Sequence, residues 1–226
     1  MKLAKLLTGL IAPGEPPSRS FLAAWEARVV QQIIATLPAQ VSASFLTKLS
    51  LAGALIAASG LLGCHFAVWP VFLVPLGVAL NWFGASVDGP LGVQRGEHDS
   101  KRRWLEHLTD LVSLLLVIVA YGFSPFLSMD SSLIIMACFL LFTAYGFLRA
   151  AVGRVVQTTL IGIGATEFRL LTATWPFIAI ALGLNHPGAG GSGRVDLAII
   201  MLSLVAILTL VVNIIVDGRN ISSSQP

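Results

Sequence analysis

The stretch LSLAGALIAASGLLGCHFAVWPVFLVPLGVALNWFGASV, residues 49–87, decides the fold of this chain. No residue between Lys48 and Asp88 is formally charged. A membrane-spanning helix needs about 20 predominantly apolar residues, so this stretch is long enough for two such helices. We therefore expect a helical hairpin that turns at Cys64 and His65.

Four further uncharged runs follow along the chain, and each can hold one spanning helix. They cover residues 111–129, 131–148, 170–193 and 197–216. We therefore predict an all-α integral membrane protein with six transmembrane helices. The predicted spans are 45–63, 67–91, 104–124, 131–152, 170–184 and 195–216.

The composition also indicates a membrane protein. Of the 226 residues, 56% are hydrophobic and only 11% are charged, whereas roughly a quarter of the residues in a soluble domain are charged. We expect one membrane domain over residues 38–217, a flexible cytoplasmic leader at 1–18 and a cytoplasmic tail at 218–226. The net charge of +3 is small and the bases are scattered, so nucleic acid is not an expected partner.

The loop lysines and arginines predict the orientation, because cytoplasmic loops carry an excess of these residues. If the N-terminus lies inside, the bases of the predicted loops fall in the cytoplasm and only Arg194 falls outside. The reverse orientation inverts this bias. We therefore expect both termini in the cytoplasm (N-in, C-in), and the simplest location is the inner membrane of a bacterium.

Residues 19–37 differ from the spans because their apolar side chains recur at every fourth position. These side chains are Phe21, Trp25, Val29, Ile33 and Leu37. The spacing predicts an amphipathic helix that lies in the membrane interface with its tryptophan at headgroup depth. The alternative is a soluble helix packed on the bundle. Pro38 is expected to end the helix in either case.

Three acids are predicted to meet where the second and third spans reach the cytoplasm. Asp88 ends the second span, and Glu106 and Asp110 lie one helical turn apart at the start of the third. Mg²⁺ commonly binds a few carboxylates together with substrate phosphate. The loop 93–103 between the spans carries bases suited to phosphate, namely Arg95, Lys101, Arg102 and Arg103. The alternative is that the acids only pair with these bases.

The run ASVDGPLGVQRGEHDSKRRWLEHLTD, residues 85–110, resembles the signature of the CDP-alcohol phosphatidyltransferase family, D-x2-D-G-x2-A-R-x8-G-x3-D-x3-D. Asp88 and Gly89 match the D-G pair, and Asp110 matches the last aspartate. Glu106 stands at the third aspartate. The positions that differ from the signature are Ala85 for the first aspartate, Gly92 and Val93 for A-R, and Arg102 for the later glycine.

The resemblance extends over residues 20–216. The segment WEARVVQQIIATLP, residues 25–38, is similar to the family's interfacial helix. The segment GATEFR, residues 164–169, resembles a G-P-T-E-x-R segment of one branch of these transferases. That resemblance makes Glu167 and Arg169 candidates for contact with a headgroup or substrate, together with Arg154.

The resemblance implies an activity in phospholipid or related lipid biosynthesis. Family members transfer a substituted phosphate group from a CDP-linked alcohol to an acceptor alcohol and release CMP. By the same resemblance, Asp88, Glu106 and Asp110 would bind Mg²⁺ or Mn²⁺, and Asp110 would also be the catalytic base. Nucleotide or phosphate would contact Gly89, Arg95 and Arg102. The implied partners are a membrane lipid, a CDP-linked alcohol and a second copy of the chain in a homodimer.

The alternative to an active transferase is a catalytically inactive paralogue that serves as a membrane binding or assembly partner. Ala85 removes a carboxylate one turn before Asp88, and loss of a metal ligand weakens metal binding. Val93 lacks the arginine of the signature, and Arg102 introduces bulk in place of a glycine. The retained Asp88, Glu106 and Asp110 favour the enzyme, and the changed positions favour the paralogue.

Overall fold

The computed structural model describes residues 21–96, 100–151, 164–184 and 193–222. The elements within these ranges are helical, in the order α2, α3, the short 3-10 helix η1, α4, α5, α6, α7 and α8. The predicted leader at 1–18 lies outside the described residues. Part of the predicted tail at 218–226 continues α8, which ends at Ser222.

The predicted hairpin is formed by α3 (Ala43–Gly63) and α4 (Leu73–Gln94), which are joined through η1 (Trp69–Phe72). Cys64 follows α3 directly and begins the turn between them. The expectation that the helical hairpin turns at Cys64 and His65 is therefore confirmed.

Glycines allow α3 and α4 to touch backbone to backbone. A Cβ atom on Gly84 would lie 2.6 Å from the Ser50 backbone nitrogen, and one on Gly53 would overlap the Asn81 backbone nitrogen. Helices in membranes associate through such small residues, since packing rather than the hydrophobic effect holds them together. The buried Asn81 amide adds hydrogen bonds to the Ser50 carbonyl (3.0 Å) and hydroxyl (2.9 Å).

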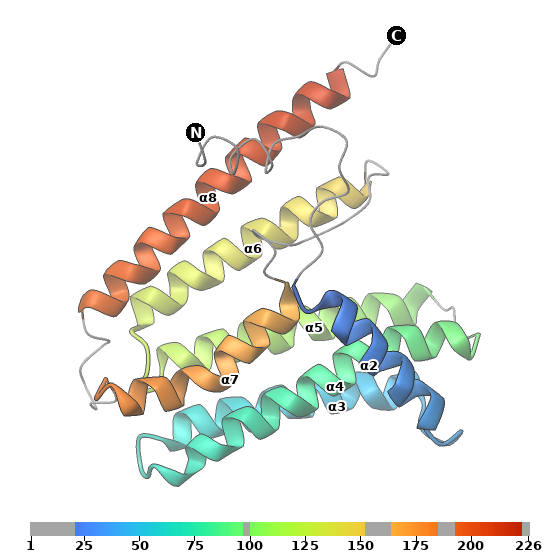
Figure 1. Ribbon diagram of the computed structural model, residues 1–226, viewed down its shortest axis with the longest axis horizontal. Helices are drawn as coiled ribbons and strands as arrows, with labels where there is room; N and C mark the ends of the chain where they lie inside the picture. Colours follow the sequence, from blue (N-terminus) through green and yellow to red (C-terminus); the bar gives the residue numbers. More distant parts are fainter. Residues whose placement is uncertain (1–20, 97–99, 152–163, 185–192, 223–226) are drawn as a thin grey trace.

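The remaining long helices continue the bundle. Figure 1 shows α3 to α8 running in alternating directions, with α5 against the hairpin and α6 beside α8. Their bounds are Ser100–Gly122 for α5, Met129–Ala151 for α6, Ala165–Ala181 for α7 and Gly193–Ser222 for α8.

Polar contacts join α6 and α8 at both ends. Near the end of α8, Asp217 accepts a hydrogen bond from the Tyr145 hydroxyl (2.5 Å) and pairs with Arg149 (3.1 Å). At the start of α8, Asp196 accepts a hydrogen bond of 2.6 Å from each of the hydroxyls of Ser128 and Ser131. These ionisable groups thus have partners where the two apolar helices meet.

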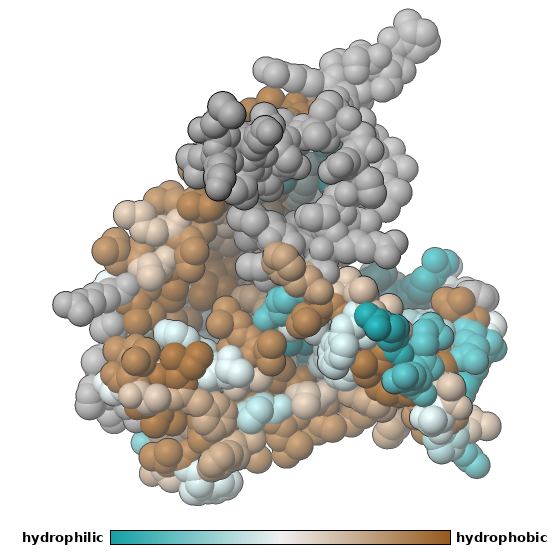
Figure 2. Space-filling model, viewed as in Figure 1, coloured by the Kyte–Doolittle hydropathy of each residue, from teal (hydrophilic) through white to brown (hydrophobic). Residues whose placement is uncertain are grey.

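Five described helical segments are long and apolar enough to cross a membrane. They are Ala43–Gly63, Trp69–Gln94, Ser100–Gly122, Met129–Arg149 and Val195–Asp217. Apolar residues predominate in the coloured part of the face seen in Figure 2, as expected for a surface in contact with lipid. The all-helical membrane protein is therefore confirmed, whereas the sixth span and the orientation stay predictions. Helix α7 is shorter than these five segments, with 17 residues.

The helix expected near residues 19–37 is present as α2 (Ala23–Thr36). Val30 and Ile34 on α2 are buried against a cluster that contains Leu46, Val87 and Leu91 of the hairpin. Hydrophilic residues gather at this end of the molecule, over α2 and the start of α5 (Figures 1 and 2). The helix thereby covers the end of the hairpin that carries Asp88, and its interfacial position stays a prediction.

The contact between α3 and α4 predicts that Gly77→Ala destabilises the protein. The added Cβ would overlap the backbone of Ala57, so the helices must move apart. Overpacking of this kind costs about 1–3 kcal/mol, and we expect a lower melting temperature for the purified protein in detergent. Gly193→Ala is the matched control, because no atom of the described residues lies within 4 Å of its added Cβ. Equal melting temperatures for the two variants would contradict this account of the hairpin.

Candidate functional site

The three predicted acids come together where α4 ends and α5 begins. Asp88 is contributed by α4, and Glu106 and Asp110 lie one turn apart on α5. The three carboxylates are close enough for their charges to interact, Asp88 with both of the others and Glu106 with Asp110. The antiparallel pairing of the two helices, which the short loop between them implies, produces this arrangement.

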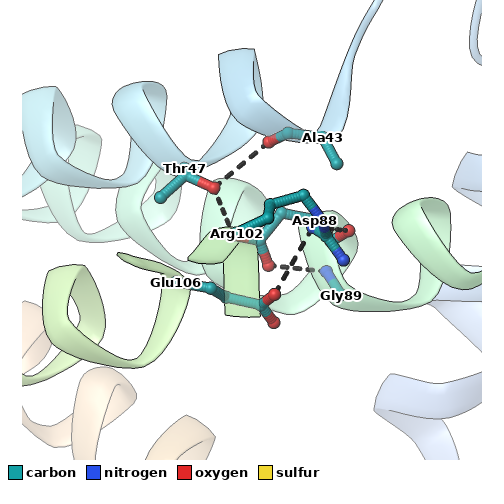
Figure 3. Close-up of polar contacts among 6 residues, drawn as sticks. All are labelled: Ala43, Thr47, Asp88, Gly89, Arg102 and Glu106. Atoms are coloured by element: carbon teal, nitrogen blue, oxygen red, sulfur yellow. Dashed lines mark hydrogen bonds and ion pairs between the residues drawn. The ribbon is translucent and has the colours of Figure 1, made fainter. Parts of the chain in front are cut away.

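Asp88 is buried, with 1% of its surface exposed, and both of its carboxylate oxygens accept hydrogen bonds. The Thr47 hydroxyl of α3 donates to Oδ2 at 2.9 Å, and the Gly89 backbone nitrogen donates to Oδ1 at 2.7 Å (Figure 3). A buried carboxylate requires such donors, because its burial is otherwise costly. The partner on α3 could not be found from the signature, which contains no α3 residue.

Glu106 and Arg102 form an ion pair that lies against two glycines of α4. Arg102 Nη1 is 3.4 Å from Glu106 Oε2 and also donates to the Asp88 carbonyl (Figure 3). A Cβ on Gly89 would lie 2.6 Å from Glu106 Oε1, and a Cβ on Gly92 would overlap the Arg102 guanidinium. Any side chain larger than hydrogen at these two positions would therefore displace the ion pair.

Two differences from the family signature are thus in direct contact. The signature has alanine at position 92 and glycine at position 102, whereas this chain has Gly92 and Arg102. The Arg102 guanidinium occupies the space that a Cβ at position 92 would take. Relative to the signature, the larger side chain of Arg102 on α5 therefore occupies the space left by the smaller Gly92 on α4.

Arg95, a predicted phosphate ligand, is engaged with the backbone between α2 and α3. Its guanidinium donates to the carbonyls of Pro38 (3.0 Å) and Ala39 (3.2 Å), and also to that of Val41. Arg95 therefore fixes this loop to the end of α4. Its role in binding phosphate stays a prediction.

Glu167, a predicted headgroup ligand, joins the starts of α2 and α7. Its carboxylate accepts hydrogen bonds from the backbone nitrogens of Leu22 (2.7 Å) and Gly164 (2.9 Å). Backbone nitrogens at a helix start have no partner within the helix, so a carboxylate stabilises both ends. Arg154, which is predicted together with Glu167 and Arg169 to contact a headgroup or substrate, lies outside the described residues.

Arg169 brings a positive charge from α7 to the acids. Its Nε donates to the Asn81 side-chain oxygen at 2.9 Å, and the guanidinium interacts electrostatically with Asp110, Glu26 and Asp88. Arg169 therefore belongs to the same group of charges as the signature residues, although nearly 60 residues separate it from Asp110 along the chain.

Glu26 is a member of this group that the sequence did not indicate. It lies on α2, and its Oε1 accepts hydrogen bonds from Trp82 Nε1 (3.0 Å) and from the Ser86 hydroxyl (2.7 Å). In the sequence Glu26 is one polar residue of an amphipathic pattern. Only the packing of α2 on α4 brings it to the site.

An apolar cavity of about 510 Å³ opens beside Arg169, between α2, α4 and α7. Its walls are apolar apart from Arg169 and Thr166, so they suit a hydrocarbon chain rather than a polar ligand. The lining residues are Leu22, Trp25, Pro75, Val78, Ala79, Trp82, Thr166, Arg169, Leu170 and Ala173.

The described residues do not form a ready metal site. Within that part of the chain, no three histidine, cysteine, aspartate or glutamate side chains converge as ligands of one ion. Asp88 accepts hydrogen bonds from Thr47 and Gly89, and Glu106 pairs with Arg102. In this arrangement Asp88 and Glu106 are already engaged with protein partners, and metal binding stays a prediction.

Comparison of the chain with protein-family models, with curated proteins and with solved structures found no match.

The buried Asp88 predicts that Thr47→Val destabilises the protein. The substitution keeps the shape of the side chain but removes the hydroxyl that donates to Asp88. A buried carboxylate that loses a donor costs about 1–3 kcal/mol, which lowers the melting temperature. Thr174→Val is the matched control, since Thr174 is exposed and, among the described residues, its hydroxyl donates to carbonyls of its own helix. A loss of stability no larger than that of the control would disprove the role of Thr47.

Proposed function

We propose that the chain is a divergent CDP-alcohol phosphatidyltransferase-like membrane protein. It transfers a substituted phosphate group from a CDP-linked alcohol to an acceptor alcohol, in phospholipid or related lipid biosynthesis. The observation that carries the proposal is the meeting of Asp88, Glu106 and Asp110 beside the guanidinium groups of Arg102 and Arg169. The acids are the residues that resemble the family signature, and arginine side chains suit phosphate groups.

In the proposed reaction the acceptor hydroxyl oxygen attacks the phosphorus that carries the alcohol of the donor. A new phosphorus–oxygen bond forms, the bond to CMP breaks, and CMP leaves with the bridging oxygen. Asp110 takes the proton of the acceptor hydroxyl, as a carboxylate positioned at a reacting group can do. Arg102 and Arg169 bind the phosphate groups and offset the charge that develops on them.

The cavity beside Arg169 supports a lipid as one of the two reactants. Its apolar walls would hold an acyl chain, and the Arg169 side chain in its lining would lie near the phosphate. Such an arrangement suits an amphiphile with an apolar tail and an anionic head. The proposed partners are thus a membrane lipid and a CDP-linked alcohol, and a homodimer is part of the same proposal.

Mg²⁺ or Mn²⁺ belongs to the proposal as the group that Asp88, Glu106 and Asp110 would hold. When bound, a divalent ion stabilises negative charge on phosphate. Binding requires Glu106 to exchange its contact with Arg102 for the ion, because the pair is formed in this structure.

We further propose that α7 is the sixth span and that the site faces the cytoplasm of a bacterial cell. The alternating directions of α3 to α8 support this, since α7 runs opposite to α6 and α8 (Figure 1). The basic residues near the site support the cytoplasmic assignment. The short length of α7 is compatible with a span that tilts little in the bilayer.

The topology predicts how three single-cysteine positions react with a membrane-impermeant maleimide. In a background with Cys64 and Cys138 replaced by alanine, His65→Cys and Leu182→Cys should be labelled in intact spheroplasts. Ala165→Cys should be labelled only after the membrane is opened. Labelling of positions 165 and 182 from the same side would show that α7 does not span.

A non-catalytic paralogue is the second candidate function. The ion pair of Arg102 with Glu106 favours it, because the pair lies on Gly89 and Gly92 beside Asp88. Ala85 also favours the non-catalytic paralogue, since it supplies no carboxylate at the position of the first aspartate of the signature. In this case the fold serves as a membrane binding or assembly partner.

CMP release from a panel of CDP-linked alcohols distinguishes the two candidates. Purified protein with Mg²⁺ or Mn²⁺ should release CMP from at least one donor when an acceptor alcohol is present. Asp110→Asn should lower the rate by about 10²–10⁴-fold, the range for loss of a general base. Asp130→Asn is the matched control, because Asp130 is exposed at the start of α6. Absence of release, together with no thermal shift from Mn²⁺ plus CDP, would favour the paralogue.

A further inference from the structure

Glu26 lies between the amphipathic helix and the site. It is half-buried on α2, and its Oε1 accepts hydrogen bonds from two side chains of α4 that are one turn apart, Trp82 and Ser86. The neighbouring Trp25 ring stacks on the Trp82 ring, with centroids 6.3 Å apart. Two polar contacts and one aromatic contact therefore hold this carboxylate in one place.

Arg169 reaches the same part of α4 from the other side of the cavity. Its Nε is bound to Asn81, the residue directly before Trp82. The guanidinium interacts electrostatically with Glu26 as well as with Asp110 and Asp88. Arg169 from α7 and Glu26 from α2 are thus attached to adjacent residues of α4, and their opposite charges interact through space rather than through a direct ion pair.

A guanidinium in a largely apolar surrounding needs negative partners to offset its desolvation. Asn81 is neutral, so it orients Arg169 without compensating its charge. Asp110 and Asp88 repel each other and Glu106, and in the proposed reaction they serve other groups. Of the three carboxylates that face Arg169, Glu26 is the one that has no such second role.

Position 85 lies between the contacts of Arg169 and those of Glu26. Successive residues of an α-helix are turned by about 100°. On α4 this places Ala85 between the row of Asn81 and Asp88 and the row of Trp82 and Ser86. A carboxylate at position 85 would therefore point between Arg169 and Glu26, and Ala85 supplies none.

We propose that Glu26 is a positioning residue that holds Arg169 at the wall of the cavity, from α2, in place of a carboxylate that α4 lacks at Ala85. The role of Arg169 toward the phosphate of a lipid-linked donor rests on the proposed function. The positioning itself can be measured without the reaction, because it concerns the hydrogen bonds of Glu26 and Arg169 to α4 and the interaction between their charges. It makes α2 a part of the site rather than an attachment to it.

The test measures modification of Arg169 by phenylglyoxal, a reagent for accessible guanidinium groups, in the full chain in detergent micelles. Peptide mass spectrometry follows the rate at Arg169. Glu26→Gln keeps the shape of the side chain but removes its charge, and the rate should rise by roughly tenfold, which lies within the range for residues that share one network of polar contacts. Arg28→Gln is the matched control on α2, because Arg28 is exposed and its hydrogen bond within the described part of the chain is to the Ala24 carbonyl. This control should leave the rate unchanged.

A second variant tests whether a carboxylate at position 85 can replace the one lost from Glu26. The double variant Glu26→Gln, Ala85→Asp has the net charge of the wild type and returns a carboxylate to the place between Arg169 and α2. Protection of Arg169 should return to within about twofold of the wild type. Ser86→Ala loosens the attachment of Glu26 without removing its charge, and should raise the rate less than Glu26→Gln does. An unchanged rate in Glu26→Gln, no recovery in the double variant, or an equal effect of Ser86→Ala would each overturn the proposal.

A functional measurement separates this proposal from the proposed function. With an active donor, Glu26→Gln should raise KM for that donor by roughly tenfold and change kcat less, because Arg169 would bind rather than react. The double variant should recover the KM. A wild type that releases no CMP would reject the proposed function, whereas the phenylglyoxal rates would still decide the role of Glu26.

Discussion

The close contact of α3 with α4 is the constraint on which the rest of the structure depends. Gly53, Gly77 and Gly84 bring the two backbones together, and no side chain of any size fits between them. Because the helices are this close, Thr47 of α3 reaches Asp88 of α4 and Ser50 reaches Asn81. A polar residue in a membrane helix needs partners from a neighbouring helix, and here the hairpin supplies them.

The second determinant is the pairing of charges at one end of the bundle. Asp88, Glu106 and Asp110 repel one another, and burial increases the cost of their charges. Arg102 offsets this from α5 itself, and Arg169 offsets it from α7. The site thus joins α4, α5 and α7 through electrostatic contacts, while Glu26 adds α2. Removing one member would leave an unpaired charge, which is costly away from water.

The positions that differ from the family signature lie next to residues of neighbouring helices that occupy the same space or supply the same kind of group. Gly92 and Arg102 exchange volume across the α4–α5 interface, so the two changes preserve the packing together. Ala85 stands where the signature that residues 85–110 resemble has an aspartate, and Glu26 brings a carboxylate to the adjacent face of α4. In both cases the volume or the carboxylate that α4 lacks relative to the signature is supplied by a residue of a neighbouring helix.

The sequence alone determined the helical membrane fold, because an uncharged run of sufficient length has no other stable arrangement in a bilayer. It also predicted the meeting of Asp88, Glu106 and Asp110, since a short loop makes successive helices antiparallel neighbours. Tertiary structure decided the rest: Arg95 binds the backbone of a distant loop, Glu167 joins two helix starts, and Glu26 and Arg169 reach adjacent faces of α4 from α2 and α7. Contacts between distant segments depend on how helix faces pack, and helical periodicity does not specify which faces meet.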